Sequence, residues 1–275
     1  MTDTTAVGAI GTTMIGASAP AGGRGGRGGR VGRVRWWTYL LLGVATFVSL
    51  FPLYWMFIVA STDSATATRM PPEIVPGDNF FHLAGLVFST VPFLQSILNS
   101  LFVATTIGVG QAVLCALAGF AFAKLRFRGS KVLFLIVVLT MTVPELATAF
   151  GIFWMRQHIA ATISDELMQA ARIDGASTWQ IFWRIAFPLV RPAAFVLGLF
   201  GFATAWNDFL WPFIVLKSPE RFTAQIAIKA LQNSYIIDLG LAMSGSLLAT
   251  LPLLVLFVLV GRRMVTGILE GAFKG

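Results

Sequence analysis

The stretch SDELMQAARIDGASTWQIFWRIAFPLVR, from Ser164 to Arg191, is the part of this chain that decides its fold. It is polar and amphipathic, and long apolar segments flank it on both sides. Ser164 can cap a helix whose first turn carries Asp165 and Glu166, where negative charge suits the helix dipole. Gly175 offers the left-handed conformation that ends many helices. The pattern predicts a short helix closed by a glycine turn.

A second helix is predicted directly after that turn. Ser177 and Gln180 have the spacing of a capping box, in which each side chain bonds the other residue's backbone amide. Pro188 is expected to end this helix, because proline is poorly tolerated inside one. The segment therefore predicts two short helices with one aromatic face, formed by Trp179, Phe182, Trp183 and Ala186.

Composition places the rest of the chain in a membrane. Hydrophobic residues make up 56% of the 275 residues, charged residues only 12%, and the mean hydropathy is +0.79. These values are too apolar for an ordinary soluble domain and predict an all-α, polytopic membrane helical bundle. The net charge of +8 does not indicate nucleic acid, because the basic residues sit beside the apolar stretches. The single cysteine, Cys115, excludes an intramolecular disulfide framework.

The N-terminal segment is interpreted separately. Residues 1–35 are rich in glycine and arginine, cannot form a core, and are predicted to be a disordered cytoplasmic tail. The apolar run from Trp36 to Ala60 is longer than the apolar region of a signal peptide, roughly 7–15 residues, and long enough to span a bilayer. We therefore expect an uncleaved first span, a cytoplasmic N-terminus and a membrane domain over residues 36–275.

The apolar stretches pose a topological conflict. Five are clear: Trp36–Ala60, Phe93–Ala123, Val132–Met155, Ala193–Leu216 and Leu241–Val260. Basic residues between Lys124 and Lys131 indicate a cytoplasmic turn. One crossing by the third stretch would then put Ser164–Arg191 outside, against the arginines at 156, 172, 184 and 191.

Two full crossings would need about 40 residues and a turn, more than this interval contains. Three explanations stay open. The third stretch forms a short re-entrant hairpin that turns near Pro144-Glu145, or it is a single span that inverts everything after it, or a deletion has impaired the chain.

The spacing of the polar segment resembles a known family motif. Gln169-Ala170-Ala171, three residues, Gly175, nine residues, Ile185, one residue and Phe187-Pro188 is similar to the EAA loop of ABC-importer permeases. Two departures are Gln169, where the family usually has Glu, and Phe187, where it usually has Leu. Glutamine keeps an acceptor but weakens a charge-assisted bond; if the position faces solvent, the change is nearly neutral.

Further wording resembles the carbohydrate branch of that family, and specifically the second permease subunit of maltose-type and glycerol-phosphate-type systems. The segments that carry it are 173–176, 206–212 and 271–275. The resemblance implies six spans, of which the third and fourth are truncated or fused here, with roughly 25–30 residues absent, about one helix and a turn.

The resemblance also implies partners. The family loop docks as a coupling helix in a cleft of a separate ATPase subunit, so ATP and Mg would bind there and no cofactor would bind this chain. Further partners would be a second permease subunit in a heterodimer, an extracytoplasmic solute-binding protein and membrane lipid. The implied coupling residues are Gln169, Ala170, Ala171, Asp174, Gly175, Ala176, Ile185 and Pro188. The alternative is an amphipathic helix that merely lies on lipid.

For the solute path, Asn207 and Asp208 are the best polar candidates, because ionisable groups in spans usually face a cavity. The alternative is that they cap a helix break before Pro212. Trp206 can stack on a sugar ring or anchor the chain at the membrane interface.

No catalytic chemistry is visible in the sequence. It contains no Gly-x-x-x-x-Gly-Lys-Ser/Thr phosphate loop and no zinc-ligand spacing, and His82 and His158 have no evident partner. We therefore expect a non-enzymatic, multi-pass permease of the bacterial cytoplasmic membrane that imports a carbohydrate or a related polyol or glycerol-phosphate-type solute. The competing hypotheses are a membrane enzyme and, because of the missing span, a non-transporting or defective accessory subunit.

Overall fold

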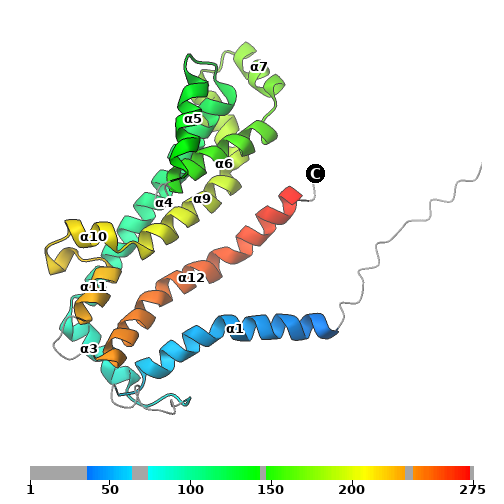
Figure 1. Ribbon diagram of the computed structural model, residues 1–275. Coiled ribbons are helices and arrows are strands. Elements are labelled where there is room, and N and C mark those ends of the chain that lie inside the picture. The colour runs from blue at the N-terminus through cyan, green and yellow to red at the C-terminus, as the bar shows by residue number, and fades with distance from the viewer. Residues whose placement is uncertain (1–35, 64–73, 143–146, 233–237, 273–275) are drawn as a thin grey trace, which may run out of the picture. The chain divides into compact units, whose positions relative to one another are not determined.

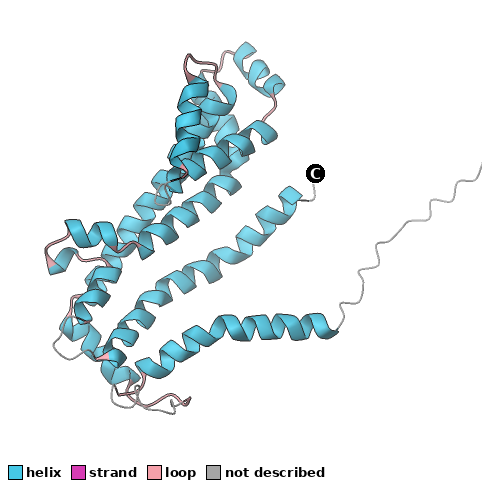
Figure 2. Ribbon diagram, viewed as in Figure 1, coloured by secondary structure: helices cyan, strands magenta, loops and turns pink. Residues whose placement is uncertain are grey.

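The computed structural model describes residues 36–63, 74–142, 147–232 and 238–272, and every regular element within them is a helix (Figures 1 and 2). The predicted all-α fold is therefore confirmed. The chain divides into two compact units, residues 1–49 and 50–275, and the boundary falls inside α1 (Trp36–Ala60). The predicted tail of residues 1–35 lies outside the described residues.

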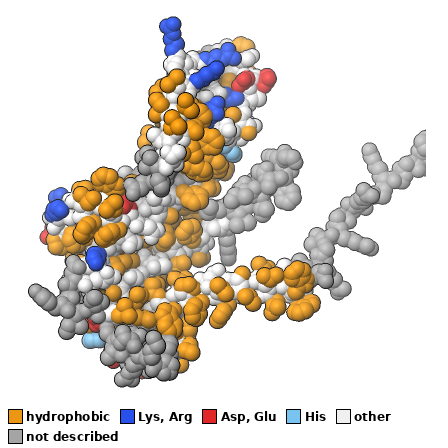
Figure 3. Space-filling model, viewed as in Figure 1, with side chains coloured by type: hydrophobic (Ala, Val, Ile, Leu, Met, Phe, Trp, Pro, Cys, Tyr) orange, Lys and Arg blue, Asp and Glu red, His pale blue; other side chains and the backbone are white. Residues whose placement is uncertain are grey.

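Four helices are long and apolar enough to cross a bilayer. They are α1, α4 (Phe93–Lys124), the continuous helical segment Thr178–Asn207, and α12 (Leu239–Ala272) through Gly261. Each exceeds the roughly 20 residues that a hydrocarbon core about 30 Å thick requires. Apolar side chains cover their outer surfaces, as Figure 3 shows for one face. Three predicted stretches, Trp36–Ala60, Phe93–Ala123 and Leu241–Val260, thus correspond to helices of membrane length. The bounds predicted for the fourth, Ala193–Leu216, are wrong, because the long helix covers Thr178–Asn207 and Leu210–Val215 forms the separate helix α10.

The remaining stretch, Val132–Met155, is not one helix. It is divided between α5 (Ser130–Thr140), which has 11 residues, and α6 (Ala147–Thr162), which has 16. At 1.5 Å per residue α5 is only about 16 Å long, roughly half the thickness of the hydrocarbon core. The explanation that this stretch is a single span is therefore wrong.

Helices α5 and α6 form a hairpin beside the C-terminal half of α4. The Phe134 ring of α5 lies 5.6 Å from Phe122 of α4 and 6.2 Å from Phe153 of α6. Helix α6 runs in the same direction as α4, since Thr148 lies against Cys115 and Arg156 Nε donates to the Phe122 carbonyl at 3.4 Å. The chain therefore returns to the end of α4 from which α5 started (Figure 1). The paired arrangement of α5 and α6 agrees with the short hairpin of the first explanation, while its re-entry into the membrane and the deletion of residues stay predictions.

Close contact between α4 and α9 (Phe187–Asn207) forms the centre of the larger unit. A Cβ atom added to Gly108 of α4 would lie 2.6 Å from the carbonyl oxygen of Gly198 in α9, so only glycine permits this approach. Close packing of two helices at a small residue is thus observed at Gly108. Helix α6 packs on the same two helices, so α4, α6 and α9 share one core.

Short helices gather at the opposite end of α4: α3 (Phe80–Thr90), α10 (Leu210–Val215), the 3₁₀ turn η2 (Pro219–Arg221) and α11 (Ala224–Leu231). Leu83 and Val87, one helical turn apart, are buried in a small core that α11 and α12 complete. Asn99 ties η2 to α4 by donating to the Glu220 carbonyl at 2.9 Å.

A topology experiment follows from the hairpin. Single cysteines placed at Arg128, Arg172 and Glu220, in a chain carrying Cys115→Ala, are all exposed positions. We expect a membrane-impermeant maleimide to label positions 128 and 172 from the same side, and position 220 from the opposite side. Labelling of positions 128 and 172 from opposite sides would contradict the hairpin, because it would mean that the segment between them crosses the bilayer once.

Candidate coupling loop and solute pocket

Helix α7 (Asp165–Ile173) starts and stops as predicted. The Ser164 hydroxyl accepts a hydrogen bond from the Leu167 amide at 3.3 Å. At the other end Gly175 has φ +78°, and the amides of Gly175 and Ala176 donate to the carbonyls of Arg172 and Ala171, both at 3.0 Å. These are the two bonds of a Schellman motif. The glycine turn is therefore a fixed structure with its backbone groups paired.

The second helix of the loop is longer than expected. The predicted capping box is present: the Ser177 amide donates to Gln180 Oε1 at 2.8 Å, and the Gln180 amide donates to Ser177 Oγ at 3.3 Å. However, α8 (Thr178–Ile181) continues through a π-helical turn, η1 (Phe182–Ala186), into α9. The helix does not end at Pro188, so that prediction is wrong.

The reason lies in the position of Pro188. It stands in the first turn of α9, directly after the wide π-helical turn. A proline inside a helix has no amide to donate and its ring clashes with the carbonyl four residues earlier, here that of Arg184. The wider turn relieves both problems. The polar loop is therefore joined to a membrane-length helix without a break.

The two faces of the loop have different surroundings. The inner face, including Met168, Ala171, Ile181, Phe182 and Ala186, belongs to the core that α4, α6 and α9 share. The structure thus places Ala171, which was expected to face a partner, against its own domain, with an exposed fraction of 6%. The other predicted coupling residues divide as follows: Gln169, Ala170, Asp174, Gly175 and Pro188 are exposed, and Ala176 and Ile185 are partly buried against the core.

The sequence analysis missed one exposed residue of this face. Ile173, the last residue of α7, has 86% of its surface exposed. A large apolar side chain at the tip of a polar helix is informative when it is so fully exposed, since such helices bury their apolar residues. The signal was present in the sequence, because Ile173 lies off the face that Met168 and Ala171 define.

The predicted aromatic face is only partly buried. Phe182 and Ala186 are in the core, whereas Trp179 is 61% exposed and Trp183 lies at the rim. The rings nevertheless contact one another, with Trp179 and Trp183 centroids 5.6 Å apart and Phe182 and Trp183 centroids 5.0 Å apart. The tryptophans therefore extend the core to the surface of the loop.

An ion pair fixes the start of α7. Lys124 Nζ, at the end of α4, lies 2.7 Å from Asp165 Oδ1. The hydrogen bond and the charge of Lys124 lower the pKa of Asp165. A carboxyl group with a lowered pKa contributes stability above its ordinary pKa and loses it as the pH falls through the lowered one. The pair is therefore intact at neutral pH, and it places the loop at the same end as the turn after α4.

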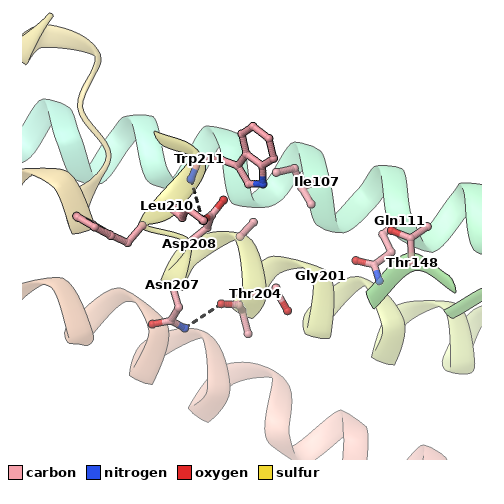
Figure 4. A pocket seen from close by; sticks show the side chains of 12 residues that line it. Ile107, Gln111, Thr148, Gly201, Thr204, Asn207, Asp208, Leu210 and Trp211 are labelled. Carbon is pink, nitrogen blue, oxygen red and sulfur yellow. Dashed lines mark hydrogen bonds between the residues drawn. The ribbon is translucent and has the colours of Figure 1, made fainter. Parts of the chain in front are cut away.

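A pocket of about 770 Å³ lies where α4, α6 and α9 meet α10 (Figure 4). Thr148, in the first turn of α6, is part of its wall, so the pocket is next to the tip of the hairpin. The polar lining consists of Gln111, Thr148, Thr204, Asn207 and Asp208, and Trp211 adds an aromatic ring.

Two of the three predicted solute-path residues line this pocket. Asn207 donates to the Ala203 carbonyl at 2.8 Å, and Asp208 accepts from the Trp211 amide at 3.4 Å, which caps the start of α10. Trp206 does not line it. Only 2% of its surface is exposed, and its ring stacks on Phe202 at 5.8 Å. Trp206 is a core residue, and Trp211 is the indole that the pocket presents.

No group of three or more His, Cys, Asp or Glu side chains with metal-binding geometry occurs among the residues that the structure describes. Together, several membrane-length helices, a polar pocket among them and a capped loop outside the apolar surface define a membrane permease. The chain matches the family model for the binding-protein-dependent transport system inner membrane component over residues 18–268. It belongs to this family and is a permease subunit of an ABC importer.

Curated relatives agree with this assignment. The chain is 30% identical to the lactose transport system permease protein LacG of Rhizobium radiobacter, over 84% of this chain and 93% of the relative. It is 26% identical to the arabinooligosaccharides transport system permease protein AraQ of Halalkalibacterium halodurans, over 86% and 96%. It is 28% identical to the sn-glycerol-3-phosphate transport system permease protein UgpE of Yersinia pestis, over 84% and 95%.

A solved structure supports the fold. The fold is similar to a chain in the crystal structure of a bacterial ABC transporter involved in the import of the acidic polysaccharide alginate, with a TM-score of 0.66 and 23% identity, over 82% of this chain and 94% of that one. The alignment with LacG runs over 258 residues but includes only 84% of the 275 residues here. Some residues of that relative therefore have no counterpart in this chain.

Gly175→Ala tests the glycine turn. A Cβ at this position meets no atom within 4 Å, so the cost comes only from the positive φ, about 1–2 kcal/mol. We expect hydrogen exchange of the α7 amides to accelerate by roughly tenfold, measured by mass spectrometry. Gly110→Ala is the matched control, because Gly110 is helical and equally uncrowded. Equal exchange in both variants would contradict a turn that depends on glycine.

Proposed function

We propose that the loop of residues 164–191 is the docking element for a separate ATPase subunit and that the pocket faces the path of a carbohydrate-type solute. The observation that carries the docking proposal is the division of the loop into two faces. Its inner face is part of the transmembrane core, and its outer face presents Ile173, Gln169 and Asp174 to the exterior. A partner that pushes on the outer face therefore moves the core directly.

The outer face suits a protein partner better than a lipid surface. It combines the exposed side chain of Ile173 with the amide of Gln169 and the carboxylate of Asp174. Gln169 and Ile173 are one helical turn apart in α7, and Asp174 is the next residue of the chain. An apolar anchor flanked by hydrogen-bonding groups is the pattern of a protein contact. A helix that lies on lipid instead needs a continuous apolar face, and in α7 the buried core already covers that face.

The proposed orientation follows from charge. Lys124, Arg126, Arg128 and Lys131 lie at the end of α4 to which the ion pair ties α7. Basic residues favour the cytoplasmic side, so the loop and the N-terminus would face the cytoplasm of a bacterium and α3, α10 and α11 the exterior. Four crossings and a re-entrant hairpin would place the basic turn after α4 and the arginines of the loop on the same, cytoplasmic side.

The chain would then act within an assembly. Because its sequence has no phosphate-binding loop, ATP and Mg would bind to ATPase subunits that contact the loop. A second permease subunit would complete the path, and an extracytoplasmic solute-binding protein would deliver the solute. The accessory-subunit hypothesis is not favoured, because it depended on a missing crossing that the hairpin makes unnecessary.

The proposed solutes share hydroxyl groups. Relatives are named for lactose, arabinooligosaccharides and sn-glycerol-3-phosphate, all of which are polyhydroxylated. The pocket offers amide, hydroxyl and carboxylate groups that can bond such hydroxyls, and Trp211 can stack on a sugar ring. Its volume of about 770 Å³ lies in the usual range for small-molecule sites.

Ile173→Asp tests the docking proposal. A charge in place of the exposed anchor is expected to weaken ATPase binding by at least tenfold, about 1.4 kcal/mol, while the fold is unchanged because Ile173 makes no core contact. The measurement is co-purification with the candidate ATPase subunit, followed by titration in nanodiscs. Thr162→Ala, at the exposed end of α6, is the control. Unchanged binding by the Asp variant would refute docking through this face.

Asp208→Asn tests the solute proposal. Asparagine is as good a helix cap as aspartate, so the variant keeps the bond to the Trp211 amide and removes only the charge. We expect uptake of radiolabelled lactose, arabinooligosaccharide or sn-glycerol 3-phosphate, whichever the wild-type transporter carries, to fall about tenfold. Asp238→Asn, a change of the same kind in the connection before α12, controls for net charge. Identical uptake by both variants would exclude Asp208 from the path.

A further inference from the structure

The coupling loop contacts α4 at two places, at its start and at the π-helical turn, although α4 is far from it in sequence. At the start of the loop, Asp165 pairs with Lys124 at 2.7 Å, a contact between residues 41 positions apart. At the start of the π-helical turn, the Phe182 ring lies 5.5 Å from the Phe120 ring. Phe120 and Lys124 are four residues apart, so they project from the same face of α4. One turn of α4 therefore contacts the loop both at the start of α7 and at the start of the π-helical turn.

The two side chains of the ion pair differ in their exposure to solvent. The Lys124 side chain has only 7% of its surface exposed, whereas Asp165 has 75% exposed. The methylene stem of Lys124 is thus packed into the protein and its ammonium group is delivered at one place, the first residue of α7. A buried stem loses little further freedom when the pair forms, so the contact is more definite than an ordinary surface ion pair.

Helix α4 also reaches the pocket. Gln111 and Ile107 of α4 are part of the pocket wall opposite Thr204 and Asn207 of α9. Lys124 and Gln111 are 13 residues apart in one unbroken helix, which is about 20 Å of rigid structure. A displacement at the end of α4 therefore reaches the pocket without crossing a flexible segment.

We propose that Lys124 and Asp165 are positioning residues that pass movement of the coupling loop to α4 and so to the pocket. The loop then acts on two helices. It continues into α9 through its backbone, and it is connected to α4 through this ion pair. Because α4 and α9 both contribute residues to the pocket wall, a displacement that reaches both helices can change the shape of the pocket. This inference rests on the proposed docking of an ATPase to the loop.

The experiment uses the transporter purified with its ATPase subunits in nanodiscs, and it needs no knowledge of the solute. A cysteine replaces Thr204 in the pocket wall, in a chain carrying Cys115→Ala, because Thr204 is exposed and Cys115 is buried. The readout is the labelling rate of that cysteine by a soluble maleimide, without nucleotide and with ATP and vanadate. We expect nucleotide to change the rate several-fold in the otherwise unaltered chain.

In this background, Asp165→Asn and Lys124→Gln are expected to reduce the nucleotide response, which is the change in labelling rate caused by ATP and vanadate, to less than half of that in the otherwise unaltered chain. ATPase binding and ATP hydrolysis are expected to persist. Glu166→Gln is the matched control. It removes a carboxylate from the same helical turn but leaves the ion pair between Lys124 and Asp165 in place. The double variant Lys124→Asp with Asp165→Lys should restore part of the response. Restoration is incomplete because a cation at the start of α7 opposes the helix dipole.

Three results would overturn the inference. The first is a full response in Asp165→Asn, and the second is an equal loss in Glu166→Gln, which would make the effect one of general charge. The third is loss of ATPase binding in parallel with the response, since the pair would then only maintain the shape of the loop. If the unaltered chain itself binds no ATPase, the proposed function fails, and the inference fails with it.

Discussion

The thickness of the bilayer relative to the length of the third apolar stretch is the constraint on which this structure depends. A hydrocarbon core of about 30 Å demands about 20 helical residues for each crossing, because backbone groups in lipid must be paired within the segment. The interval between Lys131 and Arg156 cannot supply two crossings, and one crossing would reverse the rest of the chain. Two short helices that enter and return at the same end satisfy both limits.

The hairpin determines what the loop can do. Since α6 returns to the end of α4, the loop starts beside Lys124 and can pair with it. The glycine turn then directs the chain into a helix that does not stop at the membrane surface but continues to Asn207. An ion pair holds the start of this loop, and its end continues into a spanning helix. Such a loop would pass a displacement of its outer face to the helices, whereas a flexible loop would absorb it.

The same hairpin shapes the pocket. Thr148, in the first turn of α6, forms part of the pocket wall together with residues of α4, α9 and α10. The two glycines at 108 and 198 keep its walls together at the base.

The sequence by itself determined the local structure: the caps at Ser164 and Ser177, the left-handed turn at Gly175 and the four long helices, because these depend on neighbouring residues and on apolar length. It could not show that Ala171 and Trp206 face the core, that α3 and α11 fold, or that helix continues past Pro188. Those features follow from which helices lie beside one another. Only the tertiary structure decided them, because burial and ion pairing join residues that are distant in sequence, as Lys124 and Asp165 are.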